Sequence, residues 1–168
     1  MKLIVLSDTH GKIQPAVSVL KYYQEMIQGV IHLGDYTSDA AALKRLFPKL
    51  PFYMVRGNND YDSTVPEQRE VCLGGKKILL THGHRQRVYY GLDTIAYYGL
   101  EKKADAVFFG HTHCPLVEVD GPITFMNPGS ISYPRATEYG TFGIVDIQDG
   151  IRCQIMEYRE KEDIRFFM

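Results

Sequence analysis

Short apolar runs recur along the first part of the chain, and each of them ends in a polar loop. Runs of this kind are typical of strands that are buried on both faces. They predict strands at residues 2–6, 29–33, 52–55, 77–80 and 106–109. Helices are predicted between them, at residues 15–27, 38–47 and 92–103. This alternation of strand and helix indicates an α/β protein with a largely parallel core sheet.

The helix boundaries rest on local signals. Pro15 suits the first turn of a helix, where its missing N–H costs nothing. The second helix is expected to begin at a Ser or Thr cap and to stop before Pro48. The third ends in two lysines, which stabilise the negative end of a helix dipole.

Beyond residue 110 the pattern changes to strands alone. They are predicted at residues 116–119, 123–126, 141–147 and 152–158, and Asp120-Gly121 and Asp149-Gly150 are hairpin signals between them. We expect these strands to form a second, mostly antiparallel sheet that packs on the first. The predicted fold is therefore α/β, with two packed, mixed sheets flanked by helices in a single domain of 168 residues.

Composition excludes several classes of protein. A formal net charge of −1 argues against extended nucleic-acid binding, which needs a basic face. The three cysteines, Cys72, Cys114 and Cys153, form no C-x-x-C motif, so reduced thiols in the cytoplasm are expected rather than a disulfide framework. The chain contains no apolar run of 18 residues, and no membrane association is expected.

Potential metal ligands gather in five clusters, each directly after a predicted strand. The clusters are Asp8-Thr9-His10, Gly34-Asp35, Gly57-Asn58-Asn59-Asp60, His82-Gly83-His84 and Gly110-His111-Thr112-His113. In layered α/β folds, bound molecules and ions lie at the carboxyl ends of the strands, so these five clusters are expected to meet at one site. Of the six histidines only His32 lies outside them, and we interpret it as a structural residue.

The chemistry of the clusters indicates divalent cations. Asp8 and His10 are separated by one residue, as are His111 and His113, so both members of each pair can point toward one ion. Mixed oxygen and nitrogen ligands without thiolate suit Mn²⁺, Fe²⁺ or Zn²⁺ better than Ca²⁺. Two cations about 3.5–4 Å apart are a standard device for hydrolysing phosphate esters.

The ordered set D-x-H, GD, GN, H and G-H-x-H resembles the calcineurin-like metallophosphoesterase superfamily, within it the small single-domain phosphodiesterases of bacteria and archaea. The resemblance runs from Met1 to about Ile147 and includes the loop Asn127-Pro128-Gly129-Ser130. It implies a four-layer sandwich and a phosphodiesterase or phosphatase acting on a small phosphate ester. It also implies two divalent metal ions, with Mn²⁺ expected first and Ni²⁺, Zn²⁺, Fe²⁺ or Mg²⁺ as alternatives.

The resemblance also implies roles for single residues. The first metal would be held by Asp8, His10 and His113, the second by Asn58, His82 and His111, and Asp35 would bridge the two. A hydroxide that bridges the metals would then attack phosphorus in line.

One position departs from the pattern of the superfamily, because Asn59 stands where many members have a histidine that assists the leaving group. An amide can donate a hydrogen bond but releases no proton at neutral pH. We therefore expect slow turnover or a preference for good leaving groups such as phenolates. His84 is the candidate to replace the missing acid, and Asp60 is expected to orient a neighbouring ligand.

Several alternatives stay open at this stage. A eukaryotic trafficking subunit of the retromer coat is similar in fold and size but lacks key ligands, so a non-catalytic scaffold is the second hypothesis, and a nuclease acting on short oligonucleotides is the third. The loop at residues 127–130 is either a turn or a substrate contact. Arg85 and Arg135 are interpreted as surface residues, with phosphate binding as the alternative. A homo-oligomer, dimer or tetramer, is a further alternative, and the apolar end at residues 166–168 is a candidate to dock on the core or on a second subunit.

Overall fold

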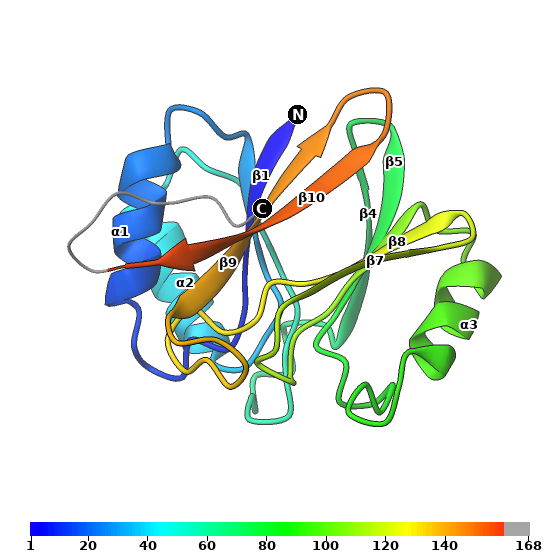
Figure 1. Ribbon diagram of the computed structural model, residues 1–168. Coiled ribbons are helices and arrows are strands. Elements are labelled where there is room, and N and C mark those ends of the chain that lie inside the picture. Colours follow the sequence, from blue (N-terminus) through cyan, green and yellow to red (C-terminus); the bar gives the residue numbers. More distant parts are fainter. Residues whose placement is uncertain (160–168) are drawn as a thin grey trace.

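The computed structural model describes residues 1–159, and the expectation for the apolar end at residues 166–168 lies outside this range (Figure 1). The described strands are β1 (Lys2–Leu6), β2 (Gly29–His32), β3 (Phe52–Met54), β4 (Gln68–Leu73), β5 (Lys76–Thr81), β6 (Ala106–Phe108), β7 (Leu116–Asp120), β8 (Ile123–Asn127), β9 (Gly140–Ile147) and β10 (Ile151–Tyr158). The described helices are α1 (Gln14–Tyr23), α2 (Thr37–Leu46) and α3 (Asp93–Glu101).

The strands form two mixed sheets of five strands each. One has the order β10-β9-β1-β2-β3 and the other the order β4-β5-β6-β8-β7. The centre of each is parallel, because β1 pairs with β2 and β2 with β3, as β5 pairs with β6 and β6 with β8. In the first sheet the antiparallel strands β9 and β10 lie on one side of the parallel strands, whereas in the second sheet β4 and β7 lie on either side of them.

The expectation of a separate antiparallel sheet after residue 110 was wrong. β7 and β8 complete the sheet of β4, β5 and β6, whereas β9 and β10 cross the molecule and complete the sheet of β1, β2 and β3. In Figure 1 the orange and red strands accordingly lie beside the blue β1. The reason is pairing at long range, since the amino-terminal β1 takes β9 as its antiparallel neighbour.

Alternating apolar residues give the molecule its four layers. Leu3 and Val5 of β1 face the core between the sheets, whereas Ile4 and Leu6 of the same strand face the helices α1 and α2. Leu79 of β5 belongs to the cluster beneath α3. Each side chain buried in this way contributes about 1.5–3 kcal/mol to folding. The layers α1 and α2, first sheet, second sheet and α3 follow one another in Figure 1, as the four-layer expectation requires.

Two local expectations differ from the structure. The second helix has no serine or threonine cap: its cap position is Tyr36, whose backbone is left-handed with φ 73°, and Thr37 is the first helical residue. The third helix ends at Glu101, before the two lysines. The described part of the chain contains no helix that is long and apolar enough to cross a membrane. All three cysteines are unpaired, as expected.

Candidate metal centre

The carboxyl ends of the strands from both sheets meet at one edge of the molecule, and two groups of candidate ligands gather there. Asp8, His10 and His113 form the first group, with 3.3 Å between His113 Nε2 and Asp8 Oδ1 and 3.2 Å between the Nε2 atoms of the two histidines. Asp8, Asp35 and His82 form the second, with 3.3 Å between His82 Nε2 and Asp35 Oδ1. Asp8 therefore belongs to both groups.

Backbone carbonyls fix the orientation of two of these imidazoles. His82 Nδ1 donates to the carbonyl oxygen of Leu33 at 2.8 Å, and His113 Nδ1 donates to that of Tyr133 at 2.7 Å. A carbonyl can only accept, so Nδ1 carries the hydrogen and Nε2 turns a lone pair toward the carboxylates. This is the arrangement in which a histidine is ready to bind a metal.

Buried polar atoms without a partner mark the same place. Asp8 and His82 are fully buried, and neither Asp8 Oδ1 nor His82 Nε2 has a hydrogen-bond partner within the described residues. An orphaned polar group of this kind costs about 1–3 kcal/mol. The two atoms lie 3.9 Å apart. A divalent cation would satisfy them, so the residues present fit the divalent metals that the sequence pattern predicts.

Charges of opposite sign support one another at the site. Burial alone would raise the pKa of Asp8, but the neighbouring imidazoles of His113 and His82 bring it below its ordinary value. Burial alone would likewise lower the pKa of His82, but Asp35 and Asp8 raise it. Asp35 titrates well below its ordinary pKa because the neighbouring imidazole of His82 and the hydrogen bonds from Asn59 outweigh its burial. The carboxylates are therefore ionised at neutral pH, which metal binding requires.

The backbone of the site is held in an unusual conformation. Left-handed φ values occur at Asp8 (56°), His10 (46°), Asp35 (50°), His111 (70°) and His113 (58°). Asp and His are among the residues that tolerate this region, but it still costs an L-residue roughly 1–2 kcal/mol. Strain of this kind persists only where the surroundings impose it, and it is typical of functional sites.

Two other candidate ligands lie at the rim of these groups. The ring of His111 is 5.0 Å from that of His82 between centroids, and its pKa is lowered to about 4 by burial and by the charge of His82. Asn58 is exposed in the turn after β3, and its side chain makes no hydrogen bond to the described residues. The structure thus brings His111 beside the second group.

The residues proposed for catalysis have distinct contacts. Asn59 donates to Asp35 twice, from its amide at 2.7 Å and from its backbone N–H at 3.1 Å. Asp60 accepts from the backbone N–H groups of Thr37 at 2.6 Å and Gly57 at 2.8 Å, so it ties the loop after β3 to the start of α2. His84 is half-buried beside His82 and His111, and its Nδ1 has no partner among the described residues.

Glycine is required where the loop passes Asp35. A Cβ atom at Gly57 would overlap Oδ1 of Asp35, so no other residue fits there without moving that carboxylate. The sequence Gly57-Asn58-Asn59 is therefore more than a turn signal. It brings the backbone N–H of Asn59 within hydrogen-bonding reach of Asp35.

The loop Asn127-Pro128-Gly129-Ser130 supports the site from beneath. Asn127 is fully buried and donates to the carbonyl oxygen of Gly110 at 2.8 Å, and Ser130, also buried, donates to that of Asp8 at 2.8 Å. Both side chains are engaged with neighbouring backbone, which favours the turn interpretation of this loop. His32 is structural, as expected: it is fully buried between Thr9 and the N–H of Gly34.

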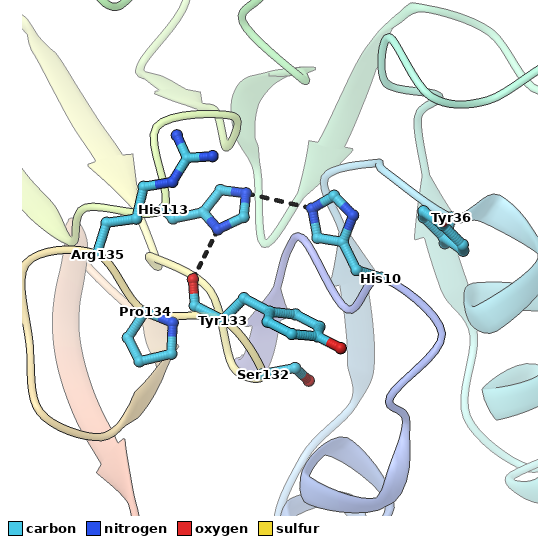
Figure 2. Close-up of a pocket in the computed structure, with 7 residues that line it drawn as sticks. All are labelled: His10, Tyr36, His113, Ser132, Tyr133, Pro134 and Arg135. Atoms are coloured by element: carbon cyan, nitrogen blue, oxygen red, sulfur yellow. Dashed lines mark hydrogen bonds between the residues drawn. The ribbon is translucent and has the colours of Figure 1, made fainter.

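A cavity of about 690 Å³ opens beside the first group. It is lined by His10, Tyr36, His113, Ser132, Tyr133, Pro134 and Arg135 (Figure 2). The sequence interpretation missed the two tyrosines, although Tyr36 directly follows Asp35. Arg135 is exposed, as the surface interpretation expects, and it also lies at this cavity. Arg85, in contrast, is held at the surface by Glu67, with 2.8 Å between its Nε and Oε2 of the carboxylate.

The sequence is similar to that of known proteins over most of its length. The model of the calcineurin-like phosphoesterase superfamily domain matches residues 1–150. The probable metallophosphoesterase YsnB of Bacillus subtilis (strain 168) is 30% identical over 150 residues, which cover 89% of this chain and 86% of YsnB. The phosphodiesterase YfcE of Escherichia coli (strain K12) is 29% identical in an alignment that covers 87% of this chain and 88% of YfcE.

Solved structures agree with this assignment. The crystal structure of a predicted phosphoesterase from Streptococcus pneumoniae TIGR4 is similar with a TM-score of 0.81 and 31% identity, over 94% of this chain and 89% of that one. Vps29 from Entamoeba histolytica, crystallised with Zn²⁺, shares the fold with a TM-score of 0.81 and 22% identity, over 98% and 96% of the two chains. With its ligand clusters in the order of the sequence pattern and a family match over residues 1–150, the chain belongs to the calcineurin-like phosphoesterase superfamily.

Proposed function

We propose that this protein hydrolyses a small phosphate ester, as a phosphodiesterase or phosphatase, with two divalent cations held at the edge described above. The observation that carries the proposal is the buried Asp8 carboxylate, which is shared by two ligand groups and has an oxygen without a partner. Mn²⁺ is the first metal to test, since the donors are carboxylate and imidazole without thiolate.

In this proposal the first cation is held by Asp8, His10 and His113, and the second by His82 together with Asn58 and His111. Asp35 lies between the two sets: its Oδ1 is 3.3 Å from His82 Nε2 and its Oδ2 is 3.7 Å from His10 Nε2. Bound cations would neutralise phosphate oxygens and lower the pKa of a water molecule that attacks phosphorus. The chain contributes by fixing its donors before the metals arrive.

The leaving group receives little help from the side chains nearby. The amide of Asn59 is engaged with Asp35, which supports a positioning role and not that of an acid. Burial and the charge of His82 hold the pKa of His84 below its ordinary value, so His84 is largely neutral at pH 7. The protein should therefore prefer esters whose leaving group needs no proton, such as phenolates.

His84 still needs a direct test as the acid. We would measure kcat of His84→Ala on one ester with a phenolate leaving group and one with an alkoxide. A loss confined to the alkoxide ester would assign the acid role to His84. An equal loss on both esters, or none on either, would speak against that role.

The decisive experiment is hydrolysis of bis-p-nitrophenyl phosphate by metal-stripped protein, with Mn²⁺, Mg²⁺, Ni²⁺ and Zn²⁺ added back separately. Metal content per chain is measured on the same samples, and Asp35→Asn serves as the control. We expect two equivalents of metal and a metal-dependent release that the control lacks. Folded protein that binds metal but releases nothing from diesters or monoesters would favour the scaffold alternative.

A further inference from the structure

The cavity beside the first ligand group has walls that metal binding does not explain. Two of its lining residues, His10 and His113, belong to that group, so the cavity opens directly onto the candidate metal. The other side chains are two tyrosines, a serine, a proline and an arginine, and no carboxylate lines it. Its volume of about 690 Å³ is that of a site for a small organic ligand.

The first wall is Tyr36, which reaches the cavity from a strained position. Its φ of 73° is left-handed, where an aromatic residue is rare and glycine or asparagine would be more stable. Its ring nevertheless stays 40% exposed, with its centroid 5.2 Å from that of His10. Folding gains little from an exposed ring in a strained conformation, so the position of Tyr36 indicates a role in binding.

The second wall is Tyr133, whose backbone contacts His113 and whose side chain lies beside His10. Its carbonyl accepts from His113 and thereby orients a candidate ligand. Its ring is 47% exposed and stands edge-on to His10 at 5.8 Å between centroids. Figure 2 shows Tyr36 and Tyr133 on two sides of His10. Two half-exposed aromatic rings thus border the space next to the first group.

A positive group completes the cavity. Arg135 donates to the hydroxyl of Tyr89, and Tyr89 donates in turn to the carbonyl oxygen of His111 at 3.1 Å. Through these bonds the guanidinium is connected to the loop that carries both histidines of the G-H-x-H motif. It has no acidic partner among the described residues, in contrast to Arg85. A braced guanidinium of this kind suits a phosphate oxygen.

We propose that this cavity binds the aromatic group of a phosphate ester against Tyr36 and Tyr133, while Arg135 contacts the phosphate. The proposal rests on the proposed function and names the substrate class for the same site: esters of a nucleoside or of a simple aryl alcohol. Both offer a planar ring that stacks on tyrosine, and base–aromatic stacking is tolerant of the ring's identity.

The test holds the leaving group constant and varies the group that stays on phosphorus. Three diesters share p-nitrophenolate as the leaving group and retain thymidine, phenyl or methyl. In each, water adds to phosphorus and the bond to p-nitrophenolate breaks. We expect kcat/KM to be at least about tenfold higher for the thymidine and phenyl esters than for the methyl ester. The order of the first two tells a nucleoside site from a simple aryl site. Equal values for all three esters would overturn the proposal.

Two variants test whether the tyrosines cause this preference. Tyr36→Asn removes the ring and places there a residue that tolerates a left-handed backbone, so the fold is expected to persist. Tyr133→Leu keeps the carbonyl that orients His113. Either change should bring the ratio of thymidine to methyl ester below about threefold. Tyr97→Leu, on a ring that is 74% exposed on α3, is the matched control and should keep the wild-type ratio. A wild-type ratio in both cavity variants would contradict the role of the rings.

A binding measurement separates this proposal from the proposed function. If no ester is hydrolysed with any metal, the proposed function fails, but the cavity can still be tested. Calorimetry then compares phenylphosphonate with methylphosphonate on wild-type protein and on Tyr133→Leu. We expect wild-type protein to bind phenylphosphonate at least about tenfold more tightly than methylphosphonate, and Tyr133→Leu to lose this difference. Equal affinity of the two phosphonates for wild-type protein would overturn the proposal even where hydrolysis is observed.

Discussion

The left-handed backbone positions at the amino ends of the parallel strands are mainly glycine, whereas at the carboxyl ends aspartate and histidine share such positions with glycine. The left-handed positions before β5 and β8 are Gly74, Gly75 and Gly121, with Lys103 before β6 as the exception. At the opposite edge the left-handed positions include Asp8, His10, Asp35, Tyr36, His111 and His113. The two edges belong to the same sheets, so the difference does not come from the fold alone.

The turns at the amino ends only reverse the chain, whereas the loops at the carboxyl ends also carry the candidate metal ligands. Glycine adopts a left-handed backbone without steric cost, and the amino-end turns use it for that reason. The carboxyl-end loops accept roughly 1–2 kcal/mol of strain at each L-residue. Hydrogen bonds from Ser130, Asn59 and Asn127 hold these loops in place. The loops at the carboxyl ends are therefore less stable than glycine turns would be, but their donor atoms are fixed in position.

The largest expected effect comes from removing the carboxylate shared by both ligand groups. Asp8→Asn keeps the shape of the side chain and suits a left-handed backbone, so the fold should remain intact. We expect metal-dependent hydrolysis to fall by about 10³-fold or more, because the cations supply several kcal/mol of transition-state stabilisation. Rates and metal content per chain are measured together. Full activity with two bound metals would refute the role of Asp8.

The next effect concerns the two arginines near this edge. Arg135→Ala should lower kcat/KM about 10–100-fold on every ester alike, the magnitude of one lost hydrogen bond to a charged group. Arg135→Lys should recover part of the loss, since lysine keeps the positive charge but lacks the planar guanidinium that can donate two parallel hydrogen bonds. Arg85→Ala is the matched control, because Glu67 already pairs with it. A similar loss in both alanine variants would mean that the loss comes from the lower positive charge near the site and not from a contact made by Arg135.

A smaller effect is expected beneath the ligand edge. The pKa of His32 is lowered to about 4 because burial disfavours its charged form. Between pH 6.5 and 4 the unfolded chain therefore binds a proton at His32 that the folded chain does not bind. The free energy of unfolding accordingly decreases as the pH is lowered through this range. At pH 5 this costs about 2 kcal/mol. Urea unfolding of metal-free protein at pH 7 and pH 5, with His32→Asn as reference, measures it. An equal pH dependence in both proteins would exclude His32 as the cause.

The smallest effects compare the two edges directly. Gly75→Ala has open space for a methyl group but a φ of 77°, so it should destabilise the protein by about 1 kcal/mol. Tyr36→Asn relieves strain of the same kind and should leave metal-free protein equally stable or up to about 1 kcal/mol more stable. Urea unfolding of both variants measures the difference. A loss of stability in Tyr36→Asn as large as that in Gly75→Ala would remove the distinction between the edges.

Much of the fold follows from local sequence. The apolar runs predicted β1, β2, β3, β5 and β6, because strands buried on both faces need continuous apolar side chains. The strand β8 was predicted too, but as part of an antiparallel sheet and not beside β6. β4 escaped prediction, since it is an edge strand with exposed polar residues such as Glu70. The sheet that receives β9 and β10 could not be predicted either. It is decided by pairing with β1 across most of the chain, and a local pattern carries no information on that.

The candidate site divides in the same way. The ligand clusters were visible because aspartate and histidine recur at strand ends with fixed spacing. The engagement of Asn59 with Asp35 was not visible, since it depends on the close passage of Gly57. Tyr36 and Tyr133 also gave no signal of their own, because tyrosine is common in this chain, with 12 residues, and a left-handed backbone cannot be read from periodicity.

The position of β1 has a consequence for how the chain is made. This strand is synthesised long before its neighbour β9, which begins only at Gly140 and lies between β1 and β10 in the finished sheet. Until β9 is synthesised, β1 has one open edge, and unpaired strand edges invite aggregation. A nascent chain that stalls before residue 140 already contains every candidate metal ligand but cannot complete the sheet that carries Asp8.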